Sequence, residues 1–254
     1  MAIVRFSEKF IRIFLIAAMI AAVSGCLSGK QNDNKPLEIT VSAASSLSDA
    51  FNDLGTEFTK THPEVKINFN FGASGTLEKQ IEQGAPVDIF AGASQLEMDS
   101  LDGKGLIIKD TRTNFTRNKL VIIAPSNITI EGLKSLNKIA IGNPKTVPAG
   151  RYAQTFLENA ELYEMTKPKL IFAENVRQAL DYVERGEVDA GFVYYSDTLK
   201  SNMSVSPVDE SLYPPIVYPI AVVKSSQQSA ISRQFIEYIQ SNDGQTILRK
   251  YGFG

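Results

Sequence analysis

The stretch from Leu37 to His62, LEITVSAASSLSDAFNDLGTEFTKTH, combines a short apolar strand with an amphipathic helix. Ser45 and Ser46 lie at the junction, where the helix is expected to begin. The start of a helix leaves several backbone N–H groups without partners, beside the positive end of the helix dipole, so it suits an anion. The strand is predicted at 39–41, and the apolar stripe of the helix comprises Leu47, Ala50, Phe51, Leu54 and Phe58.

A simpler interpretation of Ser46 is that its side chain only caps the helix. Asp49, three residues further on, would then complete a capping box. Both interpretations are open at this point. Repetition of the same arrangement along the chain favours the anion site.

The pattern of strand, small hydroxyl-rich turn and helix recurs after this stretch. The segment 65–71 alternates as a strand does, and it leads through the turn 72–76 into a helix that ends before Gly84. That turn lacks both the lysine motif of a P-loop and the three-glycine dinucleotide motif, so a nucleotide site is not expected. Strands alternating with helices predict an α/β fold of parallel sheets with helices on both faces. Further strands are predicted at 86–91, 120–124, 139–142, 170–173, 188–193 and 220–223, and further helices at 95–101, from Pro148, from Asn175 and at 230–248.

Residues 1–26 have the composition of a lipoprotein signal peptide. A basic start precedes the apolar run 13–23, which is too short to span a bilayer comfortably. The sequence Val-Ser-Gly-Cys at 23–26 resembles a lipobox, which implies cleavage before Cys26 and attachment of lipid to its sulfur. An ordinary signal peptide with an incidental cysteine is the alternative. Residues 27–36 are polar and suit a tether, so we expect an extracytoplasmic protein anchored to the outer face of the cytoplasmic membrane.

The composition and charge of the chain exclude some kinds of binding partner. The chain has 254 residues, 43% hydrophobic and 21% charged, which is enough to bury a good core. Without residues 1–25, which contain three cations and one anion, the formal charge changes from −2 to −4. No basic tract is present, so nucleic acid is not an expected partner. The single cysteine excludes an internal disulfide.

A short internal sequence repeat indicates two similarly built lobes. Residues 81–84, IEQG, lead to Val87-Asp88 and a strand, and residues 183–186, VERG, lead to Val188-Asp189 and another. If the C-terminal end packs against the first lobe, 37–117 and 220–254 form lobe I and 118–219 form lobe II. Two crossings then make a hinge, with a ligand cleft between the lobes.

The predicted turns offer hydroxyl and N–H donors rather than catalytic groups. In parallel α/β sheets such turns meet at the carboxyl ends of the strands, where ligands bind. The only histidine, His62, precedes Pro63 and is expected as a surface residue at a helix end. Asp88 and Asp189 are expected to bond backbone groups near the cleft. Binding is therefore favoured over catalysis. The turns are 44–47, 73–76, 148–151, 175–177 and 194–197.

Six segments together look like the molybdate-binding protein of ABC uptake systems, over essentially all of the mature chain. The resemblance implies the two-lobed type II periplasmic-binding-protein fold, closing on a tetrahedral oxyanion without a cofactor or a direct metal ligand. It assigns ligand contacts to the hydroxyls and adjoining N–H groups of Ser46 and Ser74, to the backbone N–H groups of Ala149 and Val176, and to the phenol of Tyr194. The segments are AASSL (43–47), GAPVD (84–88), VPAGRYA (147–153), AENVR (173–177), VY before SD (193–197) and YPIAVV (218–223).

The donor set supports the same ligand class independently. An oxyanion that carries no proton needs only donors, whereas monohydrogen phosphate also needs an acceptor, so the site should prefer molybdate, tungstate or sulfate. We therefore expect a monomeric receptor that delivers molybdate, and also tungstate, to an ABC permease. The alternatives are a receptor for sulfate or another small oxyanion, an ester hydrolase with Ser46 or Ser74 as nucleophile, and a structural surface lipoprotein with an empty cleft. The role of Ser45 stays open.

Overall fold

The structure, a computed structural model, describes residues 36–254. The predicted signal peptide, the lipidation site Cys26 and the tether up to residue 35 lie outside the described residues. Within the described part, no helix is long and apolar enough to cross a bilayer.

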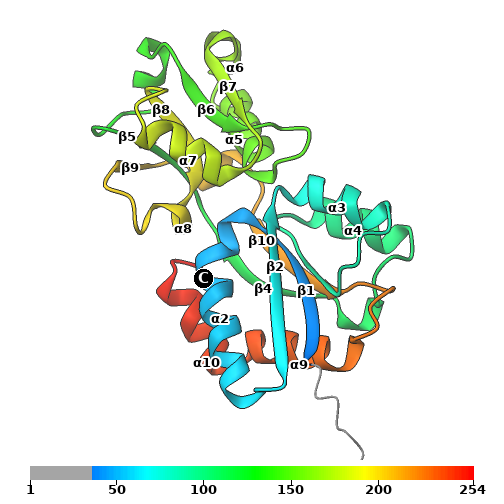
Figure 1. The fold of residues 1–254 in the computed structure, drawn as a ribbon. Helices are drawn as coiled ribbons and strands as arrows, with labels where there is room; N and C mark the ends of the chain where they lie inside the picture. Colours follow the sequence, from blue (N-terminus) through cyan, green and yellow to red (C-terminus); the bar gives the residue numbers. More distant parts are fainter. Residues whose placement is uncertain (1–35) are drawn as a thin grey trace, which may run out of the picture. The chain divides into compact units, whose positions relative to one another are not determined.

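Two five-stranded sheets organise these residues, each flanked by helices (Figure 1). The first sheet has the order β2-β1-β3-β10-β4 and the second the order β7-β6-β8-β5-β9. The strands of the first sheet are β1 (Leu37–Ala44), β2 (Val65–Gly72), β3 (Ile89–Ala91), β4 (Thr113–Asn118) and β10 (Ile216–Val222). Those of the second are β5 (Leu120–Ala124), β6 (Ile139–Gly142), β7 (Leu170–Ala173), β8 (Ala190–Tyr194) and β9 (Ser204–Pro207).

The expectation of wholly parallel sheets is wrong for one strand in each sheet, β10 in the first and β5 in the second. β1 runs parallel to β2 and β3, and β6 runs parallel to β7 and β8. β10 is antiparallel to β3 and β4, and β5 is antiparallel to β8 and β9. β10 and β5 are the strands that the chain enters when it changes sheets. A strand that follows its neighbour in parallel needs a crossover connection, usually a helix. β10 and β5 are reached without one, so they can pair antiparallel.

The chain changes sheets twice. β4 ends at Asn118 and β5 begins at Leu120, so the first crossing is Lys119. The return falls between β9 and β10, and β10 already pairs with β4 at Ile216. Asn118 and residues 216–219, which the sequence-based division placed in lobe II, therefore lie in the first sheet. Pro219 fits within β10 because the register of the ladder shifts between Tyr218 and Pro219.

The helices follow the predicted amphipathic segments, and the stripe from Leu47 to Phe58 is fully buried. The helix predicted at 230–248 is two helices that meet at Ser241, whose side chain accepts from Gly244 N–H and caps the second. The helices packed with the first sheet are α2 (Ser48–Thr61), α3 (Ser74–Glu82), α4 (Gln95–Gly103), α9 (Ser229–Gln240) and α10 (Asn242–Lys250). Those of the second are α5 (Pro148–Asn159), α6 (Tyr163–Thr166), α7 (Val176–Glu184) and α8 (Tyr195–Thr198).

The internal sequence repeat, 81–88 and 183–189, corresponds to a repeated backbone motif. Gly84 and Gly186 have positive φ angles of 86° and 70° and end their helices. The carboxylate of Asp88 accepts from Thr40 N–H at 2.7 Å and that of Asp189 accepts from Lys138 N–H at 2.9 Å. Both aspartates thus bond backbone groups, as predicted. Their expected place near the cleft is wrong, because they precede β3 and β8 and so lie at the amino ends of the strands.

Candidate functional site

All five predicted ligand-binding residues lie where a strand passes into a helical turn. Ser46 is in the 3-10 turn η1 (Ser45–Leu47) after β1, and Ser74 begins α3 after β2. Ala149 is the second residue of α5, Val176 begins α7, and Tyr194 ends β8. Two therefore come from the first sheet and three from the second, and none is more than 3% exposed.

Contacts through neighbouring residues bring these turns together. Gly75 N–H, beside Ser74, donates to the carbonyl of Thr146, just before α5, at 2.9 Å. The ring of Tyr194 packs edge-on against Tyr218 at a centroid distance of 5.9 Å. The hydroxyls of Tyr218 and Ser46 share a hydrogen bond of 2.9 Å. That the five residues share one ligand stays a prediction.

The capping interpretation of Ser46 is wrong. Because η1 lies between β1 and α2, the helix begins at Ser48 and its N-cap residue, Leu47, makes no side-chain cap bond. Asp49 instead bonds Arg177 and Lys200. Ser46 is therefore available for a role other than capping.

Ser74 Oγ accepts a hydrogen bond from the protein, which leaves its proton for another acceptor, and Ser46 Oγ can accept one in the same way. Ala93 N–H donates to Ser74 Oγ at 3.0 Å. Asn118 Nδ2 donates to the Tyr218 hydroxyl at 3.3 Å, so Tyr218 can in turn donate to Ser46 Oγ. A hydroxyl that accepts in this way still has one O–H to donate.

The first turns of α5 and α7 add backbone donors. In α5, Pro148 has no N–H, and the N–H groups of Gly150 and Arg151 donate to Val147 O at 3.0 and 3.3 Å. The Ala149 N–H is the remaining donor of that turn. In α7, the side chain of Asn175 accepts from Gln178 N–H at 3.1 Å, which confirms the predicted cap and leaves Val176 N–H ahead of it. Both helix starts present positive dipole ends.

The hydroxyl of Tyr194 is buried and has no hydrogen-bond partner among residues 36–254. Burial raises the pKa of this phenol well above its usual value, so the phenol stays protonated. Its O–H group can therefore donate a hydrogen bond to an acceptor. An unsatisfied buried hydroxyl costs roughly 1–3 kcal/mol. This is the feature of the described residues that most directly indicates a missing acceptor.

The two arginines in these first turns are already paired with carboxylates. Arg151 bonds Glu97 and, at 3.2 Å, Ser94 Oγ. Arg177 lies 2.8 Å from Asp49 and 2.7 Å from Asp197. Their charges are balanced locally, so the donors at the strand ends are neutral groups.

Asp197 joins the end of β8 to α7. Its carboxylate accepts from Tyr194 N–H at 3.2 Å and also pairs with Arg177. Burial raises the pKa of Asp197 to about 6, although the charge of Arg177 lowers it. This group therefore titrates close to neutral pH.

Replacing Asp197 with asparagine is expected to remove a pH dependence from folding stability. Because the folded pKa lies above the ordinary value of 3.8, the folded state binds a proton more readily than the unfolded state between the two values. The wild-type free energy of unfolding should rise, relative to that of Asp197→Asn, by about 1 kcal/mol as pH falls from about 7 to about 5. Urea unfolding of both proteins at the two pH values measures this, and a constant difference would contradict the raised pKa.

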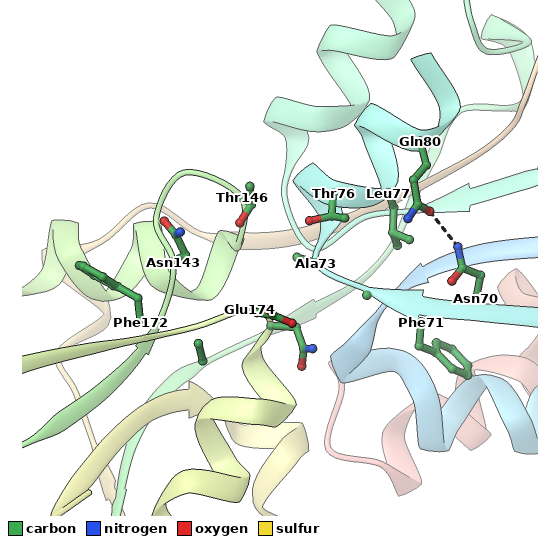
Figure 2. A pocket seen from close by; sticks show the side chains of 13 residues that line it. Asn70, Phe71, Ala73, Thr76, Leu77, Gln80, Asn143, Thr146, Phe172 and Glu174 are labelled. Carbon is green, nitrogen blue, oxygen red and sulfur yellow. Dashed lines mark hydrogen bonds between the residues drawn. The ribbon is translucent and has the colours of Figure 1, made fainter. Parts of the chain in front are cut away.

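A groove of about 470 Å³ opens beside the site, and residues from both sheets line it (Figure 2). Thr76 and Gln80 of α3 lie on one side, and Asn143 and Thr146 of the loop after β6 lie on the other. Its lining includes Ala73 and Asn175, the residues just before Ser74 and Val176. The sequence analysis predicted a cleft between the lobes but did not assign Gln80, Asn143 or Thr146 to it, although the hydroxyl of Thr146 in a turn before Pro148 was a usable signal.

The hydrolase alternative gains no support from the geometry around Ser46. His62 is the C-cap residue of α2, as predicted, and its ring stacks on that of Phe58 at a centroid distance of 4.1 Å. Ser46 precedes the other end of this 14-residue helix, which is about 21 Å long, so the two cannot form a catalytic pair. No group of three or more potential metal ligands occurs within residues 36–254.

Comparison with known proteins identifies the class. Residues 39–254 match the family of bacterial extracellular solute-binding proteins. The chain belongs to this family.

Individual relatives are more specific. Molybdate-binding protein ModA of Escherichia coli is 35% identical over 97% of this chain and 98% of its own length. YvgL of Bacillus subtilis, named as a candidate ABC transporter substrate-binding lipoprotein, is 38% identical over 94% and 96%. The Azotobacter vinelandii periplasmic molybdate-binding protein superposes with a TM-score of 0.80 at 24% identity, over 85% of this chain and 98% of that one. These matches confirm the predicted resemblance and the two-lobed α/β fold.

Proposed function

We propose that this chain is a receptor that captures molybdate, and also tungstate, for an ABC transporter. The observation that carries the proposal is the buried Tyr194 hydroxyl, a donor without an acceptor on a ring that packs against Tyr218, the partner of Ser46. The names of the homologous molybdate-binding proteins support the choice of ligand. The proposed contacts are the hydroxyls of Ser46, Ser74 and Tyr194 and the N–H groups of Ala149 and Val176.

The polarity of these groups selects the kind of anion. Each of the three hydroxyls can donate a hydrogen bond to the anion, and the arginines in the first turns of α5 and α7 are paired with the carboxylates of Glu97 and Asp197. Monohydrogen phosphate would bring a proton that finds no acceptor among the five donors, which is costly in a buried site. Molybdate, tungstate and sulfate accept from all five, so sulfate is the second candidate, and cavity size decides between them.

The cellular setting follows from the sequence and from the relatives. We propose a non-enzymatic, monomeric protein whose lipid at Cys26 holds it outside the cytoplasmic membrane, beside the permease that it supplies. The lipobox and the name of the Bacillus subtilis relative support the anchor. Two lobes, built on the two sheets, would close on the anion as a two-state shift driven by contacts to both.

Calorimetric titration of residues 27–254 tests the ligand. We expect saturable heat with molybdate and tungstate at one site per chain, weaker or no heat with sulfate, and none with phosphate. All described strands, helices and core residues lie within this segment. No heat from molybdate and tungstate would reject the proposal, and strong sulfate binding alone would favour the second candidate. The lack of tryptophan makes calorimetry a safer probe than fluorescence.

A further inference from the structure

The arginines in the first turns of α5 and α7 both reach from the second sheet to helices packed with the first. Arg151, two residues after Ala149, bonds Glu97 of α4. Arg177, next to Val176, bonds Asp49 of α2. Each helix proposed to give an N–H to the ligand therefore also carries a cation that bonds a carboxylate of the opposite half, although Arg177 pairs with Asp197 of its own half as well.

Asp49 receives two cations from the second half. Its Oδ2 lies 2.8 Å from Arg177 Nη2, and its Oδ1 lies 2.5 Å from Lys200 Nζ, just beyond α8. Burial would raise the pKa of Asp49, but the hydrogen bonds and charges of Lys200 and Arg177 outweigh it and leave the pKa lowered. Asp49 is therefore an ionised group whose partners lie in the other half.

Glu97 is the more deeply buried member of the second pair, at 2% exposed. Ser94 donates to its Oε2 at 2.5 Å, while Arg151 bonds its Oε1. A buried carboxylate that loses its cation is strongly penalised. Separation of the halves would therefore be opposed on this side as well as at Asp49.

We propose that Arg177–Asp49–Lys200 and Arg151–Glu97 are interlobe clamps that set ligand affinity by stabilising the closed form. They act as positioning groups and do not touch the anion. A ligand that binds only the closed form gains affinity in proportion to the fraction of closed protein. The identity of the ligand in this inference rests on the proposed function, but the closure itself does not.

Asp49→Asn tests the clamp, with Asp53→Asn as a matched control. Asp53 lies one turn further along α2 and bonds Lys250 and Tyr251, which belong to the same half as α2. For residues 27–254 we expect the molybdate dissociation constant of Asp49→Asn to rise about five- to tenfold, mainly through faster dissociation, and that of the control to change less than about twofold. Asp49→Glu should recover part of the loss.

A second readout needs no ligand. The Gly75 amide donates across the two halves to Thr146 O, so its hydrogen exchange reports closure of the free protein. Exchange, measured well below the melting temperature of each protein, should be faster in Asp49→Asn than in wild type or Asp53→Asn. Equal Gly75 exchange in Asp49→Asn and Asp53→Asn, or equal molybdate affinity, would overturn the clamp. If wild type gives no heat with molybdate, the proposed function fails and exchange alone decides the clamp.

Discussion

Tyr194→Phe is expected to weaken molybdate binding by about 10- to 100-fold while stabilising the ligand-free protein by about 1 kcal/mol. The phenol is buried without a hydrogen-bond partner in residues 36–254, so its removal relieves an unsatisfied group. With the anion bound, the same hydroxyl would donate to a charged acceptor, which contributes more than a neutral hydrogen bond. Calorimetry with molybdate and urea unfolding of the free protein measure the two effects.

Tyr218→Phe provides the matched contrast. Both tyrosines are fully buried and their rings pack together, but the Tyr218 hydroxyl bonds Ser46 and Asn118. Its loss should destabilise the free protein by about 1 kcal/mol or more, opposite in sign to the effect of Tyr194→Phe. If both variants lose stability equally, Tyr194 has a partner within the protein and does not mark the ligand site.

The elements of the fold were predictable where the signal is local. Pro148 does begin α5, Asn175 does cap α7, and Gly84 and Gly186 do end their helices in the left-handed region. Each of these signals depends on the conformation of one residue or on a bond that spans three residues. The strand-to-turn junctions, and hence the five candidate donors, followed from the same local patterns and from a family resemblance.

The predictions that the structure contradicts concern contacts between segments that are distant in the sequence. Ser46 lies 172 positions from its partner Tyr218, and Asp49 lies 128 from Arg177, so no local pattern could show that these residues do not form a capping box. The antiparallel β5 and β10 depend on where the chain changes sheets, which strand periodicity does not encode. The individual side chains that line the groove or form the clamps come from both halves, so no single segment could identify them.

Gly150→Ala is expected to destabilise the protein by about 2–4 kcal/mol and to weaken molybdate binding about 100-fold. A Cβ on residue 150 would lie 1.8 Å from the Gly142 carbonyl oxygen and 2.5 Å from its carbon. Both are backbone atoms at the end of β6, so no side chain can move aside. The start of α5 would have to shift, and Ala149 N–H would shift with it. Urea unfolding and calorimetry measure the two losses.

Gly103→Ala is the control for the substitution itself. Gly103 ends α4, and a Cβ there would meet nothing within 4 Å, so stability should stay the same or rise slightly and molybdate binding should not change. The comparison separates the close approach of α5 to β6 from the general effect of adding a methyl group. If Gly150→Ala loses stability but keeps wild-type affinity, the first turn of α5 does not hold the anion, and Ala149 must be removed from the proposed set of donors.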